Sequence, residues 1–151
     1  FIMAEKANIA RILNDLITIN KDHIVGLKEA VHDMEKDQKK VRQLLKAMTE
    51  QSERFIDELK EKVHELGAEV TDKTITTGWV YNAWMDIAYS DADERPEISN
   101  FCDQIAHTTL QWYRSALMKL KDLDKNIFDL VFRQNQELVK SCNEIKDAME
   151  S

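Results

Sequence analysis

Residues 9–34 read IARILNDLITINKDHIVGLKEAVHDM, and this stretch decides the fold class of the chain. Its apolar residues recur at spacings of three and four, which is the period of one face of an α-helix. The members of this stripe are Ile9, Leu13, Leu16, Leu27, Ala30 and Met34. Two polar residues, Asn20 and His23, interrupt the same stripe. The stretch therefore predicts a long amphipathic helix with polar side chains on its buried face.

A second stripe of the same period follows the charged residues 35–40. It comprises Val41, Leu44, Leu45, Met48, Ser52, Phe55, Leu59, Val63 and Leu66. A short link between two long helices favours an antiparallel hairpin. Gly67 can adopt the left-handed conformation that ends many helices, so we expect the second helix to stop at Leu66.

The last third of the chain shows the same pattern twice, around a turn at residues 122–124. The first stripe comprises Ile98, Phe101, Cys102, Ile105, Thr109, Trp112, Ala116 and Leu120. The second comprises Ile127, Leu130, Val131, Gln134, Leu138, Ser141, Cys142, Ile145 and Met149. Pro96 suits the first turn of a helix, where a backbone N–H is not needed. A second hairpin is the expected structure.

Residues 68–95 differ in composition and form the predicted crossover between the two hairpins. Their Thr-rich start disfavours helix, whereas residues 78–89 are expected to form a short amphipathic helix with Thr77 as its N-cap. Its aromatic residues are expected to pack against the bundle or a second subunit, or else to form an exposed patch for a partner. These aromatic residues are Trp79, Tyr81 and Trp84.

Two hairpins joined by one long crossover are typical of ferritin-like connectivity. We predict an all-α, ferritin-like antiparallel four-helix bundle that forms a single domain over residues 1–151. The expected helices cover about residues 6–35, 38–66, 96–120 and 124–149.

The composition of the 151 residues excludes several functional classes. Three glycines, one proline and 43% apolar residues favour a helical protein with a continuous core. The net charge of −7 disfavours nucleic-acid and membrane-surface roles. With only two cysteines, no signal-peptide pattern and no apolar run that could span a bilayer, the expected location is the cytoplasm. We also find no Gly-rich phosphate loop, Cys-x-x-Cys pair or nucleophile elbow, so the sequence argues against the common enzyme classes.

A di-iron centre in such a bundle needs a Glu from each of two helices and Glu-x-x-His from each of the other two. No histidine follows His107, so the last helix cannot supply its share. Two Glu-x-x-His strings, at residues 29–32 and 61–64, lie roughly 30 Å apart along a hairpin that turns near residue 37. They cannot share one site, and we interpret them as surface residues.

A buried polar layer is the preferred interpretation of the interrupted stripes. His23 would lie level with Ser52 across the first hairpin, with Asn20 and Gln134 as further hydrogen-bonding residues. If the protein does bind metal or catalyse a reaction, the weak candidates are His23, Glu50, Glu53, Asp103 and His107.

Cys102 and Cys142 are equidistant from the turn between the last two helices and could face each other. Buried cysteines commonly act as small apolar residues. A redox or metal-binding role is the alternative.

Several strings resemble a bacterial family of ferritin-like four-helix-bundle proteins without an established activity. They include Leu13-Asn14-Asp15-Leu16-Ile17, Glu50-Gln51-Ser52 and Ala83-Trp84-Met85-Asp86. The resemblance covers roughly residues 9–147. It implies the bundle fold, a cytoplasmic setting and a tendency to dimerise, and relatives in the wider superfamily bind two metals.

The chain departs from that family pattern where acidic or histidine ligands would be expected. Val25 and Lys28 replace acidic residues in the first helix, Ala106 replaces a Glu, and Cys142 replaces a His. These departures argue against a metal site. The sequence therefore predicts a non-enzymatic homo-oligomer, stress-associated or scaffolding, without a cofactor. The alternative is a divergent metal-binding or di-iron oxidase-like protein that uses iron or another divalent metal.

Overall fold

The computed structural model describes residues 2–33, 38–71 and 98–150, apart from the side chains of residues 2, 33, 98–103, 105, 106 and 150. These residues contain α-helices and no strand. The helices are α1 (Ile2–Asp33), α2 (Lys39–Glu65), α4 (Ile98–Leu120) and α5 (Lys125–Glu150). The described part of the chain is therefore all-α, as the stripes predict.

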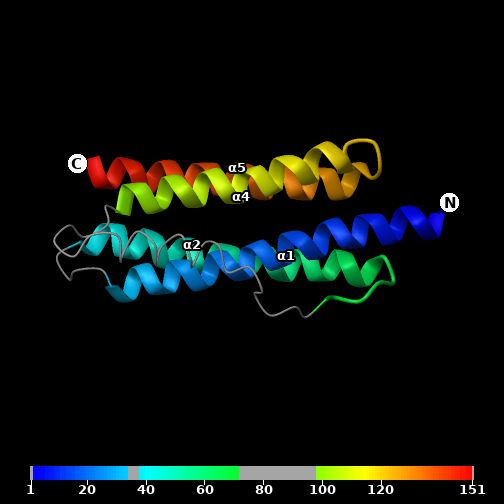
Figure 1. Ribbon diagram of the computed structural model, residues 1–151, viewed down its shortest axis with the longest axis horizontal. Helices are drawn as coiled ribbons and strands as arrows, with labels where there is room; N and C mark the ends of the chain where they lie inside the picture. Colours follow the sequence, from blue (N-terminus) through cyan, green and yellow to red (C-terminus); the bar gives the residue numbers. More distant parts are fainter. Residues whose placement is uncertain (1, 34–37, 72–97, 151) are drawn as a thin grey trace.

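The helices pack as an antiparallel four-helix bundle (Figure 1). α1 packs against α2 and α4, and α5 packs against α4 and α2, so each helix has two neighbours. The end of α2 and the start of α4 lie at opposite ends of the bundle (Figure 1). Such a pair of hairpins requires a long connection, in agreement with the predicted crossover. Residues 72–97 lie outside the described residues, and with them the predicted short helix, Trp79, Tyr81 and Trp84.

The first helix begins earlier than its apolar stripe. We predicted about residues 6–35, whereas α1 covers Ile2–Asp33. Residues 3–7 are exposed, so no buried stripe marks them, but Ala, Glu and Lys among them are strong helix formers. The observed bounds of the other three helices differ from the predicted ones by no more than two residues. None of the described helices is long and apolar enough to cross a bilayer.

The core follows the inner stripes of all four helices. Its largest fully buried side chains include Leu13, Leu16, Leu27, Leu45, Phe55, Leu59, Tyr113, Leu120, Leu138 and Ile145. Full burial of one such side chain contributes about 1.5–3 kcal/mol.

The most buried aromatic position of α4 differs from the prediction by one residue. Trp112, which we placed inward, is half-buried, and its neighbour Tyr113 is fully buried. Thr109, Tyr113, Ala116 and Leu120 are spaced by four, three and four residues, which puts Tyr113 on the inner stripe and Trp112 on its flank.

Gly67 ends α2 as predicted. Its φ of +73° lies in the left-handed region that favours glycine. The Gly67 N–H donates to the His64 carbonyl at 2.9 Å and the Ala68 N–H donates to the Val63 carbonyl at 3.1 Å, which together form a Schellman motif.

The segment after this motif packs on α1 through Asn14. The Asn14 Nδ2 donates to the Glu69 carbonyl at 3.2 Å, and the Thr71 N–H donates to Asn14 Oδ1 at 3.0 Å. At the other hairpin, the Asp124 carboxylate accepts from the Ile127 N–H at 3.0 Å and caps α5.

Candidate functional site

A layer of polar side chains crosses the interior of the bundle. It comprises Asn20 and His23 on α1, Ser52 on α2, Thr109 and Tyr113 on α4, and Gln134 on α5, all of them buried. Buried polar groups are stable only when they are hydrogen-bonded. The partners of each side chain therefore determine what this layer can do.

Asn20 joins α1 to α4. Its Nδ2 donates to the Leu16 carbonyl at 2.8 Å within α1 and to the Tyr113 hydroxyl at 2.9 Å on α4. Both protons of the Asn20 amide are thus engaged, one in its own helix and one across the interface.

Tyr113 continues this connection to the remaining helices. Its hydroxyl donates to Gln134 Oε1 on α5 at 2.8 Å. Gln134 Nε2 then donates to the Phe55 carbonyl and to Glu58 Oε1 on α2, both at 3.3 Å. A directional series of hydrogen bonds therefore connects α1, α4, α5 and α2.

The electrostatics of Tyr113 suit a neutral hydroxyl that accepts one hydrogen bond and donates another. Burial raises the pKa of Tyr113, the hydrogen bond from Asn20 opposes this shift, and the nearby charge of Glu58 adds to it. The phenol keeps its proton at any physiological pH, so it can donate to Gln134.

The series ends at a surface ion pair. Glu58 is paired with Arg133 of α5, which also donates to Glu137 at 3.4 Å. Further along the same two helices, Gln51 Nε2 donates to Ser141 Oγ at 3.0 Å. The exposed ion pair and the partly buried contact of Gln51 complete the polar connection between the two hairpins.

His23 makes a separate contact within the layer. Its Nδ1 lies 2.9 Å from Ser52 Oγ, and the tautomer decides which atom donates. Burial lowers the pKa of His23 from 6.5 to about 4, so the imidazole is neutral near pH 7. Its second nitrogen, Nε2, is buried and has no hydrogen-bond partner among the described residues.

The other predicted candidates do not join this layer. Glu50, Glu53 and His107 are exposed, and His107 Nε2 lies 3.2 Å from Gln111 Nε2 on the surface of α4. His32 and His64, from the two Glu-x-x-His strings, are exposed as well.

Asp103 and Cys102 lie in α4, but their side chains are outside the described residues. Cys142 is buried as a thiol. Whether the two cysteines face each other stays a prediction.

The described residues do not fit a di-iron centre. They contain no group of three or more His, Cys, Asp or Glu side chains that could hold a metal ion. The polar layer supplies one imidazole together with amides and hydroxyls, whereas iron in such bundles is held by carboxylates and histidines. Asp22 is buried next to His23 in sequence, but adjacent residues of a helix do not face each other, and Asp22 has an interaction of its own.

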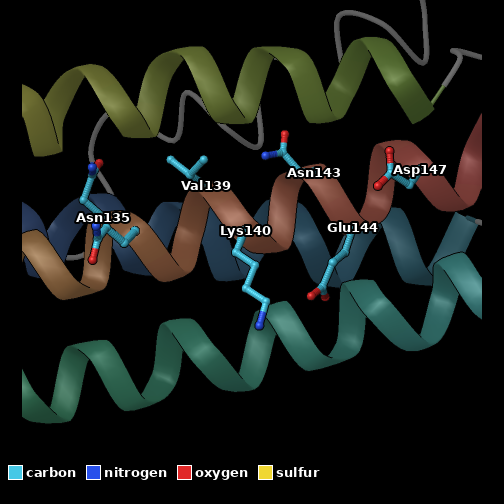
Figure 2. Close-up of a pocket in the computed structure, with 7 residues that line it drawn as sticks. Asn135, Val139, Lys140, Asn143, Glu144 and Asp147 are labelled. Atoms are coloured by element: carbon cyan, nitrogen blue, oxygen red, sulfur yellow. The ribbon is translucent and has the colours of Figure 1, made fainter.

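A groove on the outer face of α5 is the second feature of interest (Figure 2). Its volume is about 550 Å³, and the described residues that line it all belong to α5. Val139 projects from this face as an apolar side chain between the polar Asn135 and Asn143 (Figure 2). Apart from Val139, the lining residues are polar or charged, so the groove is a largely polar surface of α5.

Sequence reasoning missed Tyr113, which links α1 of the first hairpin to α5 of the second through its hydroxyl. A usable signal existed, because Tyr113 stands four residues after Thr109 and three before Ala116. The more apolar Trp112 was assigned to the stripe instead.

Comparison with known proteins shows the family and the fold. The profile of a family described as "Domain of unknown function (DUF2383)" matches residues 8–119. A search of curated proteins gave no significant match.

Two solved structures of Mycobacterium smegmatis Dps are similar to the chain. The tetragonal form is 18% identical, with a TM-score of 0.74, and the match covers 95% of this chain and 86% of that chain. A C-terminal deletion mutant is 17% identical, with a TM-score of 0.76, over 96% of this chain and 99% of that chain. At such low identity these similarities show the fold alone, which is an all-α ferritin-like bundle. The predicted fold class is confirmed.

Proposed function

This chain belongs to the family described as a domain of unknown function (DUF2383), and from that premise we propose that it is a non-enzymatic bundle protein that acts as a homo-oligomer. Its polar interior serves to hold its own helices in register. A bacterial, cytoplasmic setting comes from the resemblance described above, and a scaffolding or stress-associated role comes from an intact core pattern beside a depleted set of metal ligands; both are part of the same proposal.

One observation carries this proposal: the interior polar layer is made of neutral groups that bind one another. Asn20, Tyr113 and Gln134 each form a hydrogen bond with a group on a neighbouring helix. None of the three side chains carries a charge that could bind a substrate or a metal. Buried polar contacts of this kind can specify one helix arrangement among several. A structural role accounts for every partner of these three side chains.

Self-association is supported by apolar side chains on the outer face of α5. Phe132 is 43% exposed and Val139 is 36% exposed. Phe132 stacks on Phe128 with ring centroids 6.0 Å apart. Exposed aromatic residues are typical of contact surfaces between proteins.

Analytical ultracentrifugation tests the oligomeric part of the proposal. We expect the parent protein to sediment as a concentration-dependent oligomer and Phe132→Ser to weaken the association. Met118→Ser is the matched control, because Met118 is 74% exposed but lies on α4. A parent protein that stays monomeric at all concentrations would remove this part of the proposal.

A divergent metal-binding or di-iron oxidase-like protein is the second candidate. One observation favours it, namely the buried Nε2 of His23 that has no partner among the described residues. Elemental analysis of protein purified without chelator separates the two functions. The structural proposal predicts no stoichiometric metal, whereas two metal ions per chain that survive gel filtration would favour the oxidase-like function.

A further inference from the structure

Two buried polar atoms of the interior layer have no hydrogen-bond partner within the described part of the chain. They are His23 Nε2 on α1 and Thr109 Oγ1 on α4. Both side chains are completely buried. An unsatisfied polar atom in a core is costly, and such atoms are commonly bridged by a buried water molecule.

The hydrogen bond between Asn20 and Tyr113 fixes how α1 and α4 lie against each other. His23 is three residues after Asn20, and Thr109 is four residues before Tyr113. Because the two helices are antiparallel (Figure 1), both steps lead in the same direction along the bundle. At ~1.5 Å per residue they amount to about 4.5 Å and about 6 Å, so His23 and Thr109 lie at nearly the same level.

The two side chains also share the face that α1 and α4 turn toward the interior. Spacings of three and four residues keep His23 on the stripe of Asn20 and Thr109 on the stripe of Tyr113. The opposite ring nitrogen of His23 is engaged by Ser52 of α2. His23 Nε2 is therefore the atom of the imidazole that can reach a group lying toward α4.

We propose that His23 Nε2 and Thr109 Oγ1 form a buried binding site for one small neutral hydrogen-bonding molecule, which is water in the isolated protein. The site joins α1 to α4 one helical turn away from the contact between Asn20 and Tyr113. Because Ser52 contacts Nδ1, a molecule bound at this site gives His23 a hydrogen-bond partner on each ring nitrogen. This inference does not depend on the proposed scaffolding function.

The chemistry of the site selects a neutral molecule that can both donate and accept. The Thr109 hydroxyl can do either, and His23 Nε2 takes the role that its tautomer leaves open. An ion would be poorly stabilised, because the two side chains proposed to line the site are neutral and the interior has a low dielectric constant. A single imidazole with a hydroxyl is also too poor a ligand set for a transition metal.

The test is a high-resolution crystal structure of the full chain at neutral pH, combined with ¹⁵N NMR of the His23 ring. We expect density for one water within hydrogen-bonding distance of both atoms. Thr109→Val, which is nearly isosteric but lacks the hydroxyl, should remove this density and shift the His23 Nε2 resonance. Thr109→Ser keeps the hydroxyl and should preserve both signals. Thr108→Val, on the half-buried flank of α4, is the matched control and should change neither.

Three results would contradict the proposed binding site. The first is a direct hydrogen bond between His23 Nε2 and another side chain, with no density between His23 and Thr109. The second is a His23 Nε2 resonance that Thr109→Val leaves unchanged. The third is anomalous scattering from a metal at this position, which would also overturn the non-enzymatic proposal. The first two leave that proposal intact, so failure of the site and failure of the function can be distinguished.

Discussion

The amide of Asn20 donates to the hydroxyl of Tyr113 at 2.9 Å across 93 residues of sequence, and this contact joins the two hairpins inside the bundle. The same hydroxyl donates to Gln134 Oε1 on α5, so a single phenol oxygen holds α1, α4 and α5 in one register.

Tyr113→Phe should lower the free energy of unfolding by ~1–3 kcal/mol while leaving the fold intact. The substitution keeps the ring but deprives Asn20 and Gln134 of a partner in a buried environment. Urea denaturation followed by circular dichroism measures the change. Trp112→Phe, at the half-buried neighbour, is the comparison for an aromatic substitution on the flank of α4. An unchanged free energy of unfolding in Tyr113→Phe would show that the hydroxyl is irrelevant.

Tyr113→Phe and Gln134→Leu should be non-additive. Each substitution breaks the same hydrogen bond, so the double variant should be more stable than the sum of the single effects predicts, by ~0.5–3 kcal/mol. A double-mutant cycle by urea denaturation checks this coupling. Strict additivity would mean that the two side chains act independently.

The protein should lose stability as the pH falls from about 6.5 to about 4. Burial lowers the pKa of His23 from 6.5 to about 4 in the folded state, so within this window the unfolded chain binds a proton that the folded chain does not. At ~1.4 kcal/mol per pK unit, the loss of stability through His23 is on the order of 3–4 kcal/mol over the whole window.

The same pH series with His23→Leu isolates this contribution. The variant should fold with parental helicity, because leucine has a similar volume, although Ser52 loses its partner at ~1–3 kcal/mol. Its free energy of unfolding should vary less between pH 6.5 and pH 4. Parallel pH profiles of the parent and His23→Leu would contradict a neutral buried imidazole.

Gly67→Ala should destabilise the protein by ~1 kcal/mol through its backbone alone. The φ of +73° is unfavourable for alanine, whereas a Cβ at this position would meet nothing within 4 Å. Gly67→Asn should cost less, because asparagine tolerates the left-handed region better. Thermal unfolding of the two variants tests the order, and an alanine variant more stable than the asparagine variant would contradict it.

The fold class could be predicted from the sequence because long apolar stripes report directly on helix faces. Asn20, His23, Ser52 and Gln134 interrupt those stripes, and the structure buries all four side chains. Their pairing could not be predicted, because it depends on the rotation and register of helices that are far apart in sequence.

Two errors of the sequence analysis have physical causes. Tyr113 was missed because its apolar neighbour Trp112 matches the spacing of the inner stripe of α4 almost as well as Tyr113 does. The start of α1 was missed because exposed residues leave no periodic signal.

An anaerobic Fe(II) titration of the parent protein and His23→Leu, followed by isothermal calorimetry, tests most directly that the polar interior is structural. We predict that neither protein shows saturable binding of two ions per chain and that the two titrations coincide, while urea denaturation shows the lower stability of the variant. Saturable binding of two ions by the parent protein, lost in His23→Leu at unchanged stability, would contradict a structural role and identify the layer as a metal site.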